Sequence, residues 1–224
     1  MIASPALAGL ALNRGAPASA RPRRWLWVSL AAAVTLAIAI GALAAALAVG
    51  AARFGPPVGG GGAVAGRAGL SLVTSVLEEL GWAGGGLGLA TAALGRRWGV
   101  GVLGLVWAAW HLVPTVLRVG LFPELEVAPP AMLGAFVVAC LIYRELLTTL
   151  REFAGTWLAA AAGHAAPNIL LAVLLAGGLG GLERPGVWPF FPAPGGLVFP
   201  VLALAALMAL RRWGPATASG RRPE

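Results

Sequence analysis

Two adjacent acids, Glu78 and Glu79, stand inside the apolar stretch LEELGWAGGGL, which runs from Leu77 to Leu87. Near the centre of a membrane helix an acid costs about 2.5–3.5 kcal/mol on insertion scales, whereas a leucine gains only about 0.3–0.6 kcal/mol. Two such acids therefore need polar partners or a wet cavity within a helical bundle. Adjacent residues of an α-helix point about 100° apart, so we expect one acid to act and the other to support it.

Both histidines of the chain and one of its two asparagines also stand inside apolar stretches, as His111 and as His164 with Asn168. His164 and Asn168 are four residues apart, so in a helix they share a face and can point at one reacting group. Pro167 lies between them and lacks an N–H. We therefore expect the carbonyl of Gly163 to lose its helical hydrogen bond and to need polar surroundings.

These residue types can hydrolyse a peptide bond. A carboxylate beside an imidazole can take a proton from water, and an imidazole with an amide can donate hydrogen bonds to the oxyanion that forms at an attacked carbonyl. Alternatively, Glu78, His111 and His164 form the three-ligand set of a catalytic zinc, with water in the fourth place. The sequence leaves open whether a divalent metal such as zinc or no cofactor is used.

The composition indicates an all-α integral membrane protein. Of 224 residues, 59% are hydrophobic and 11% charged, against averages of about 45–50% and about 25% for soluble domains. The net charge of +8 comes from arginines that stand in tails and short loops, where they set topology and contact anionic lipid rather than nucleic acid. The single cysteine, Cys140, excludes a disulfide framework.

Six apolar segments have about the length that crosses a bilayer. They are residues 25–50, 68–94, 98–118, 128–149, 154–177 and 196–213. We expect one membrane domain of six helices over 25–213, with tails over 1–24 and 214–224. The alanine-, glycine- and arginine-rich composition is typical of a GC-rich bacterial genome, so we expect a multi-pass protein of a bacterial cytoplasmic membrane.

Arginine counts predict that both termini are cytoplasmic. In this orientation twelve arginines lie inside, Arg144 among them, and four lie outside. The outer four are Arg53, Arg67, Arg118 and Arg184. The glycine- and proline-rich linkers 55–62 and 185–196 then lie outside and are predicted to be flexible connections.

The depth of the polar residues allows them to meet. At 1.5 Å per residue, Glu78, His111 and His164 lie about 15–20 Å into a hydrocarbon core of about 30 Å. All three fall within one or two helical turns of the midplane.

Three short motifs resemble, in order and spacing, those of the CPBP family of intramembrane proteases, which includes the CAAX prenyl endopeptidases. EELGWAG is similar to its EExxxR motif, WAAWHLVP to FxxxH, and HAAPN to HxxxN, and the resemblance covers about residues 70–177. It implies that Glu78 activates water with His111, that Glu79 supports it, and that His164 with Asn168 forms the oxyanion side. Both metal-dependent and metal-free mechanisms have been argued for this family.

The sequence departs from the family pattern at two positions. Trp107 replaces the phenylalanine of FxxxH, which is a mild aromatic exchange. Ala83 replaces the arginine of EExxxR, which would stand four residues after Glu79 and pair with it. Another arginine, Arg118 or Arg144, could supply this charge from elsewhere in the chain.

Ala83 therefore keeps a second function open, that of a catalytically silent family member acting as a membrane scaffold or binding protein. A third, a proton- or ion-handling transporter that uses the acid pair, is disfavoured by the lack of internal repeats. For an active enzyme we expect membrane lipids as surroundings and membrane-associated peptides or proteins as substrates.

Overall fold

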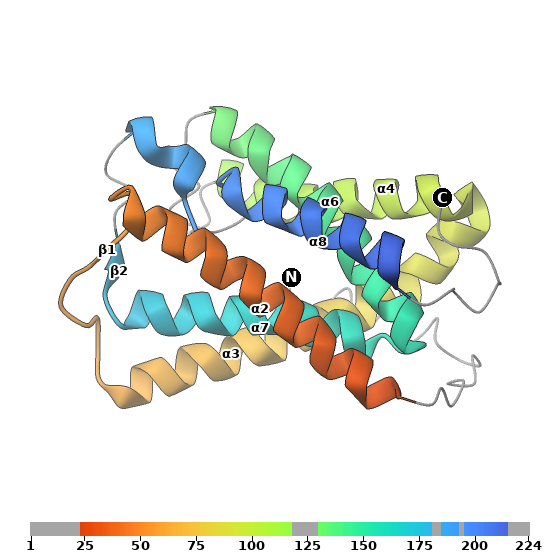
Figure 1. The fold of residues 1–224 in the computed structure, drawn as a ribbon, viewed down its shortest axis with the longest axis horizontal. Helices are drawn as coiled ribbons and strands as arrows, with labels where there is room; N and C mark the ends of the chain where they lie inside the picture. The colour runs from red at the N-terminus through yellow and green to blue at the C-terminus, as the bar shows by residue number, and fades with distance from the viewer. Residues whose placement is uncertain (1–22, 118–129, 181–184, 193–194, 215–224) are drawn as a thin grey trace.

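The computed structural model describes residues 23–117, 130–180, 185–192 and 195–214, which form a bundle of helices (Figure 1). The α-helices are α2 (Arg24–Ala48), α3 (Gly61–Glu79), α4 (Leu87–Val116), α6 (Pro130–Ala154), α7 (Leu158–Ala176) and α8 (Val198–Trp213). A π-helical stretch, η1 (Leu80–Gly86), joins α3 to α4, and a 3₁₀ helix, η2 (Pro185–Phe190), precedes α8. The predicted all-α class is confirmed.

The helix that begins at Gly61 turns back on itself at Gly95. This glycine has φ 73° and ψ 166°, a left-handed conformation that other residues rarely adopt, and the chain reverses there at the right-hand end of the bundle in Figure 1. A Cβ atom on Gly99 would lie 2.6 Å from the carbonyl oxygen of Ala90, so glycine is needed where the two arms meet. The predicted segments 68–94 and 98–118 are these arms, although the first begins seven residues earlier.

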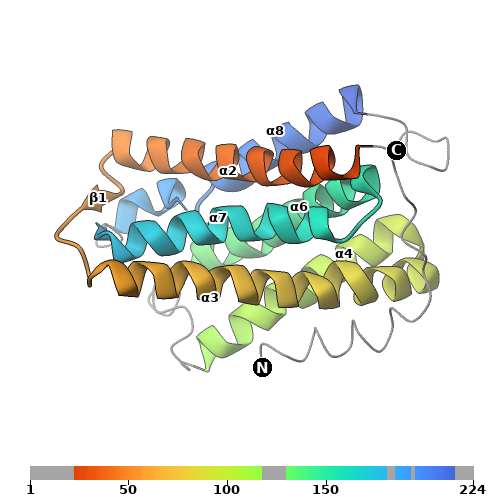
Figure 2. The ribbon, with the colours of Figure 1, turned by 90° about the horizontal axis from the view of Figure 1, so that it is seen from below.

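The helices are arranged in two groups of three. In one, α7 lies between α2 and α3; in the other, α6 lies between α4 and α8 (Figure 2). Small residues of α7 allow this helix to pack closely against α6. A Cβ atom on Gly163 would lie 2.9 Å from Cδ2 of Leu147 on α6. Leu146, Leu147 and Leu150 of α6 are fully buried between the groups.

Among the described residues, four helices are long and apolar enough to cross a membrane. They are Arg24–Ala48, Gly61–Thr115, Pro130–Ala154 and Leu158–Ala176. The second contains both arms on either side of Gly95, and α8 has 16 residues. The protein is therefore an all-α membrane protein, and the count of six crossings stays a prediction.

Two helix boundaries near the site were predicted wrongly. Helix α6 continues to Ala154 instead of ending at 149, and α7 begins at Leu158 instead of 154, because Gly155 turns the chain with φ 66°. His164 therefore lies six residues, or about 9 Å, into its helix.

Arg144 was counted with the cytoplasmic arginines because it lies near the inner end of the predicted segment 128–149, whereas it is buried within α6. Without it the arginine count is eleven against four, so the predicted orientation is unchanged. The tails 1–22 and 215–224, Arg118 and Arg184 lie outside the described residues.

A short strand pair, which the sequence did not predict, ties two connections together. Strand β1 (Arg53–Phe54) pairs antiparallel with β2 (Leu179–Gly180). Gly178 has φ 93°, and a Cβ atom there would lie 2.5 Å from the carbonyl oxygen of Gly55. The linker 55–62, which was predicted to be flexible, is therefore anchored at its start to the end of α7.

Candidate functional site

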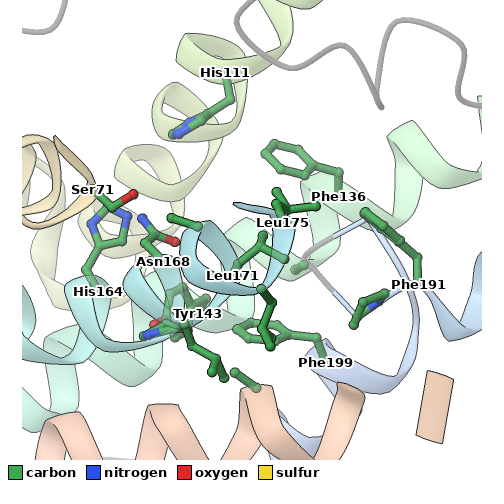
Figure 3. A pocket seen from close by; sticks show the side chains of 18 of the residues that line it. Ser71, His111, Phe136, Tyr143, His164, Asn168, Leu171, Leu175, Phe191 and Phe199 are labelled. Carbon is green, nitrogen blue, oxygen red and sulfur yellow. The ribbon is translucent and has the colours of Figure 1, made fainter. Parts of the chain in front are cut away.

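A cavity of about 340 Å³ lies between α2, α3, α4, α6, α7 and the start of α8. Its polar wall consists of Ser71, Thr74, Glu78, His111, His164 and Asn168. Figure 3 shows Ser71, His111, His164 and Asn168 on one side and Phe136, Phe191 and Phe199 on the other. Four predicted site residues, Glu78, His111, His164 and Asn168, thus line one cavity, whereas Glu79 is not part of its wall.

Glu78 lies in the last turn of α3, half-buried at the cavity wall. Its Oε2 accepts a hydrogen bond of 3.2 Å from the indole Nε1 of Trp107 on α4. An ionised carboxylate accepts through both oxygens. Glu78 is therefore held through one oxygen while its side chain faces the cavity.

His111 lies one helical turn after Trp107. Its Nδ1 is 2.9 Å from the carbonyl oxygen of Trp107, and since a carbonyl only accepts, Nδ1 is assigned the proton. In the neutral ring Nε2 then carries the lone pair. His111 lies within electrostatic range of Glu78, His164 and Arg144, and it lines the same cavity as Glu78.

Glu79 lies beneath the cavity wall and has 0% side-chain exposure. Its carboxylate binds the guanidinium of Arg144 through two hydrogen bonds, of 2.7 Å to Nη1 and 2.9 Å to Nη2. The Nδ1 of His164 lies 3.1 Å from Oε1 of the same carboxylate. Glu79 thus orients the His164 ring from behind, and its supporting role in the reaction stays a prediction.

Arg144 gives Glu79 the arginine partner that the EExxxR motif places at position 83, where this chain has alanine. Ala83 is 2% exposed and lies in the π-helical η1, where hydrogen bonds close over five residues instead of four, so position 83 is not directly above Glu79. Arg144 reaches Glu79 from α6 and lies 4.2 Å over the ring of Trp107. Of the two arginines considered from the sequence, Arg144 binds the acid, and Arg118 lies outside the described residues.

Asn168 and His164 share a face of α7, as their spacing predicts. The amide Nδ2 of Asn168 donates a hydrogen bond of 3.1 Å to Oγ of Ser75 on α3, and Ser75 is 1% exposed. An amide carries two N–H groups. Ser75 therefore fixes the amide through one of them and so sets the direction of the other.

The carbonyl of Gly163, which Pro167 deprives of its helical partner, is bound by Tyr143. The hydroxyl of Tyr143 donates to this oxygen at 2.7 Å, and both residues are buried. The polar surroundings expected for this carbonyl therefore come from one side chain of α6.

Sequence reasoning missed three of these residues. Ser75 stands with Ser71, Thr74 and Glu78 at helical spacings of three and four, a polar stripe that could have indicated it. Tyr143 is the one tyrosine of the chain. Phe191, in a linker predicted to be a flexible connection, lines the cavity and carries no comparable signal.

The described side chains show no ready-made metal site. No three His, Cys, Asp or Glu residues among them are grouped closely enough to hold a metal ion. The Nδ1 atoms of His111 and His164 are directed at the Trp107 carbonyl and at Glu79, which leaves Nε2 as the nitrogen of each ring that could bind a metal or a water. The ligand set of Glu78, His111 and His164 stays a prediction, and the chemistry proposed below uses the chain's own side chains.

The chain is similar to a known protein family. Residues 60–170 match the family described as type II CAAX prenyl endopeptidase Rce1-like, a range that contains Glu78, Glu79, His111, His164 and Asn168. No curated protein and no solved structure matches the chain.

Proposed function

The chain belongs to the CPBP family of intramembrane proteases, and on that premise we propose that it is an active endopeptidase, similar to the CAAX prenyl proteases. It hydrolyses peptide bonds of membrane-associated substrates with a water activated by Glu78 and His111. The observation that supports this most is that Glu78, His111, His164 and Asn168 line one cavity. The apolar remainder of that cavity suits the side chains of a membrane-embedded peptide.

In the proposed reaction a water binds between Glu78 and Nε2 of His111. Glu78 takes a proton from the water, and the oxygen attacks the scissile carbonyl to form a tetrahedral oxyanion. Glu78 then returns the proton to the leaving amine as the C–N bond breaks. One new carboxyl and one new amino terminus result from each water consumed.

His164 and Asn168 stabilise the oxyanion in this reaction. Because Nδ1 of His164 is directed at Glu79, Nε2 donates only when the ring is protonated. Arg144, Glu79 and a protonated His164 carry a net charge of +1. A positive group buried beside the developing oxyanion lowers the barrier, which gives Arg144 a part in catalysis without contact to substrate.

Substitution of Glu78 by Gln tests the proposal. The purified protein, reconstituted in liposomes with membrane-anchored peptides, should cleave a subset of them, with products identified by mass spectrometry. Glu78→Gln should lose about 10²–10⁴-fold in rate while its thermal unfolding is unchanged. Equal cleavage by wild type and Glu78→Gln would exclude Glu78 as the base.

The alternative of a catalytically silent family member rests on Ala83. Arg144 provides Glu79 with a cation from α6, which weakens that argument. Cleavage by the wild-type chain supports the active enzyme, whereas cleavage only by the Ala83→Arg variant supports a lapsed one.

We propose further that both termini are cytoplasmic and that the protein resides in a bacterial cytoplasmic membrane. The excess of arginines on the predicted inner side supports this orientation. Reporter fusions at the two ends, active in the cytoplasm only, should both be active. Activity at one end alone would mean an odd number of crossings.

A further inference from the structure

Trp107 contacts both halves of the site. It is 4% exposed, and its Nε1 donates to Oε2 of Glu78 at 3.2 Å. Its ring meets the rings of His111 and His164 edge-on, with centroid distances of 5.5 and 5.1 Å. On the other side lies the guanidinium of Arg144, 4.2 Å from the ring centroid.

We infer that Trp107 is a positioning residue that holds Glu78 ready to act as a base, an inference that rests on the proposed function. The indole N–H donates and cannot accept, so it binds Oε2 as an acceptor. It also orients the carboxyl group, so that Oε1 is the oxygen available for the attacking water.

This role depends on the N–H and not on aromatic packing. The motif that WAAWH resembles carries phenylalanine at this position, and a phenyl ring packs against Arg144 and the two histidines but donates no hydrogen bond. The indole of Trp107 therefore gives this chain an interaction with its catalytic acid that the motif residue does not provide. The exchange from phenylalanine, which from sequence looked mild, is thereby assigned a function.

The charged and titratable groups around Glu78 come from three other helices. His111 of α4 and Cys140 of α6 lie within electrostatic range of it, and Arg144 of α6 lies across the Trp107 ring. His164 of α7 touches the edge of the same ring. Replacing Trp107 by Phe keeps all of these groups, so a changed pH response isolates the indole N–H.

The experiment compares Trp107→Phe with wild type across pH. We expect kcat at neutral pH to fall about tenfold, in line with the loss of one hydrogen bond to a charged group. KM should stay within about twofold, and the acid limb of the kcat/KM profile should move. A purely structural role for Trp107 would not move that limb.

Trp82→Phe is the matched control. Trp82 also lies beside the site, packed edge-on against Trp110 with centroids 6.2 Å apart, but among the described residues its buried Nε1 has no hydrogen-bond partner. Its pH profile should match that of wild type.

Infrared spectroscopy gives a second readout that does not need activity. The carboxylate band of Glu78, identified as the band absent from Glu78→Gln, should shift in frequency in Trp107→Phe, because Oε2 loses its hydrogen bond. If Trp107→Phe does not fold, 3-benzothienylalanine at position 107 keeps the ring shape, lacks the N–H and serves for both measurements.

The outcomes separate the two proposals. An unchanged pH profile and an unchanged Glu78 carboxylate band in Trp107→Phe would overturn the inference even if the enzyme is active. Cleavage that does not depend on Glu78, or no cleavage at all, would instead count against the proposed function, while the infrared band still decides whether Trp107 holds the carboxylate.

Discussion

Arg144 of α6 and Glu79 of α3 form a two-pronged ion pair inside the helix bundle, with 1% and 0% side-chain exposure. Both carboxylate oxygens are bound, at 2.7 and 2.9 Å, and one of them also meets His164. The pair therefore fixes α3 against α6 and holds the carboxylate against the imidazole. Breaking such a pair costs more than the pair contributes, because a buried charge is left without a partner.

Substituting Arg144 by Met should destabilise the protein by about 3–5 kcal/mol, since it leaves Glu79 buried and unpaired. The free energy of unfolding in detergent measures this. Arg144→Lys keeps the charge but cannot bind both oxygens, so its stability should lie between those of Arg144→Met and wild type. A change below about 1 kcal/mol in Arg144→Met would mean that Glu79 does not need the cation.

Ala83→Arg should have opposite effects in two backgrounds. In wild type, residue 83 is 2% exposed and the carboxylate of Glu79 is already bound, so an added arginine should lower stability and activity. In the Arg144→Met background the place beside Glu79 is empty. Position 83 is not directly above Glu79, but the long side chain of the new arginine should reach its carboxylate and restore part of both stability and activity. Cleavage assays and unfolding curves of the four proteins decide this. A gain of activity from Ala83→Arg in wild type would show that Arg144 does not replace the motif arginine.

Substituting Ser75 by Ala should lower kcat by about 2- to 10-fold, because the Asn168 amide loses the hydrogen bond that orients it. Thr91→Ala is the control: its hydroxyl also donates a hydrogen bond, but to the carbonyl of Leu87 within α4. Steady-state kinetics of both variants check this. Equal rates for Ser75→Ala and wild type would show that Asn168 is positioned by other contacts.

The sequence predicted the helices because a membrane helix must satisfy its own backbone, so long apolar segments have few alternatives. Polar side chains are costly inside a membrane, so Glu78, His111, His164 and Asn168 stood out in the sequence. Ser75 and Tyr143 escaped notice because single hydroxyls are cheap in apolar helices and their partners are distant in sequence: Ser75 and Asn168 are 93 residues apart. Such pairs are set by helix packing, which hydropathy does not encode.

The boundary errors have a local cause. The charged pair Arg151 and Glu152 suggested a loop after residue 149, whereas α6 continues through both residues to Ala154 and ends where Gly155 takes a left-handed backbone. Arg144 was counted on the cytoplasmic side because it lies near the expected end of the segment 128–149, where a charge is usually at the membrane surface. Arg144 is instead buried because it forms an ion pair with Glu79, a residue of a different helix.

Substituting Arg96 by Ala should lower the free energy of unfolding by only about 0.5–1 kcal/mol, and this loss should be smaller at high salt. Arg96 binds Glu152 through Nε at 2.8 Å and Glu145 through Nη1 at 2.8 Å, which joins α4 to α6. Its side chain is 33% exposed, so solvent screens these pairs. Arg97→Ala, a neighbouring exposed arginine over the Trp98 ring, is the control and should show a smaller change with salt. Unfolding measured at low and high ionic strength checks both.

Tyr143 and Pro167 should be energetically coupled through the carbonyl of Gly163. Tyr143→Phe removes the hydroxyl that donates to this oxygen, and a buried acceptor without a partner costs about 1–3 kcal/mol. Pro167→Ala restores the N–H that a helix normally directs at the carbonyl four residues earlier. In the Pro167→Ala background, Tyr143→Phe should therefore be destabilising by clearly less than in wild type. A double-mutant cycle of unfolding free energies measures this difference, and additive effects of the two substitutions would mean that the Gly163 carbonyl is not their common partner.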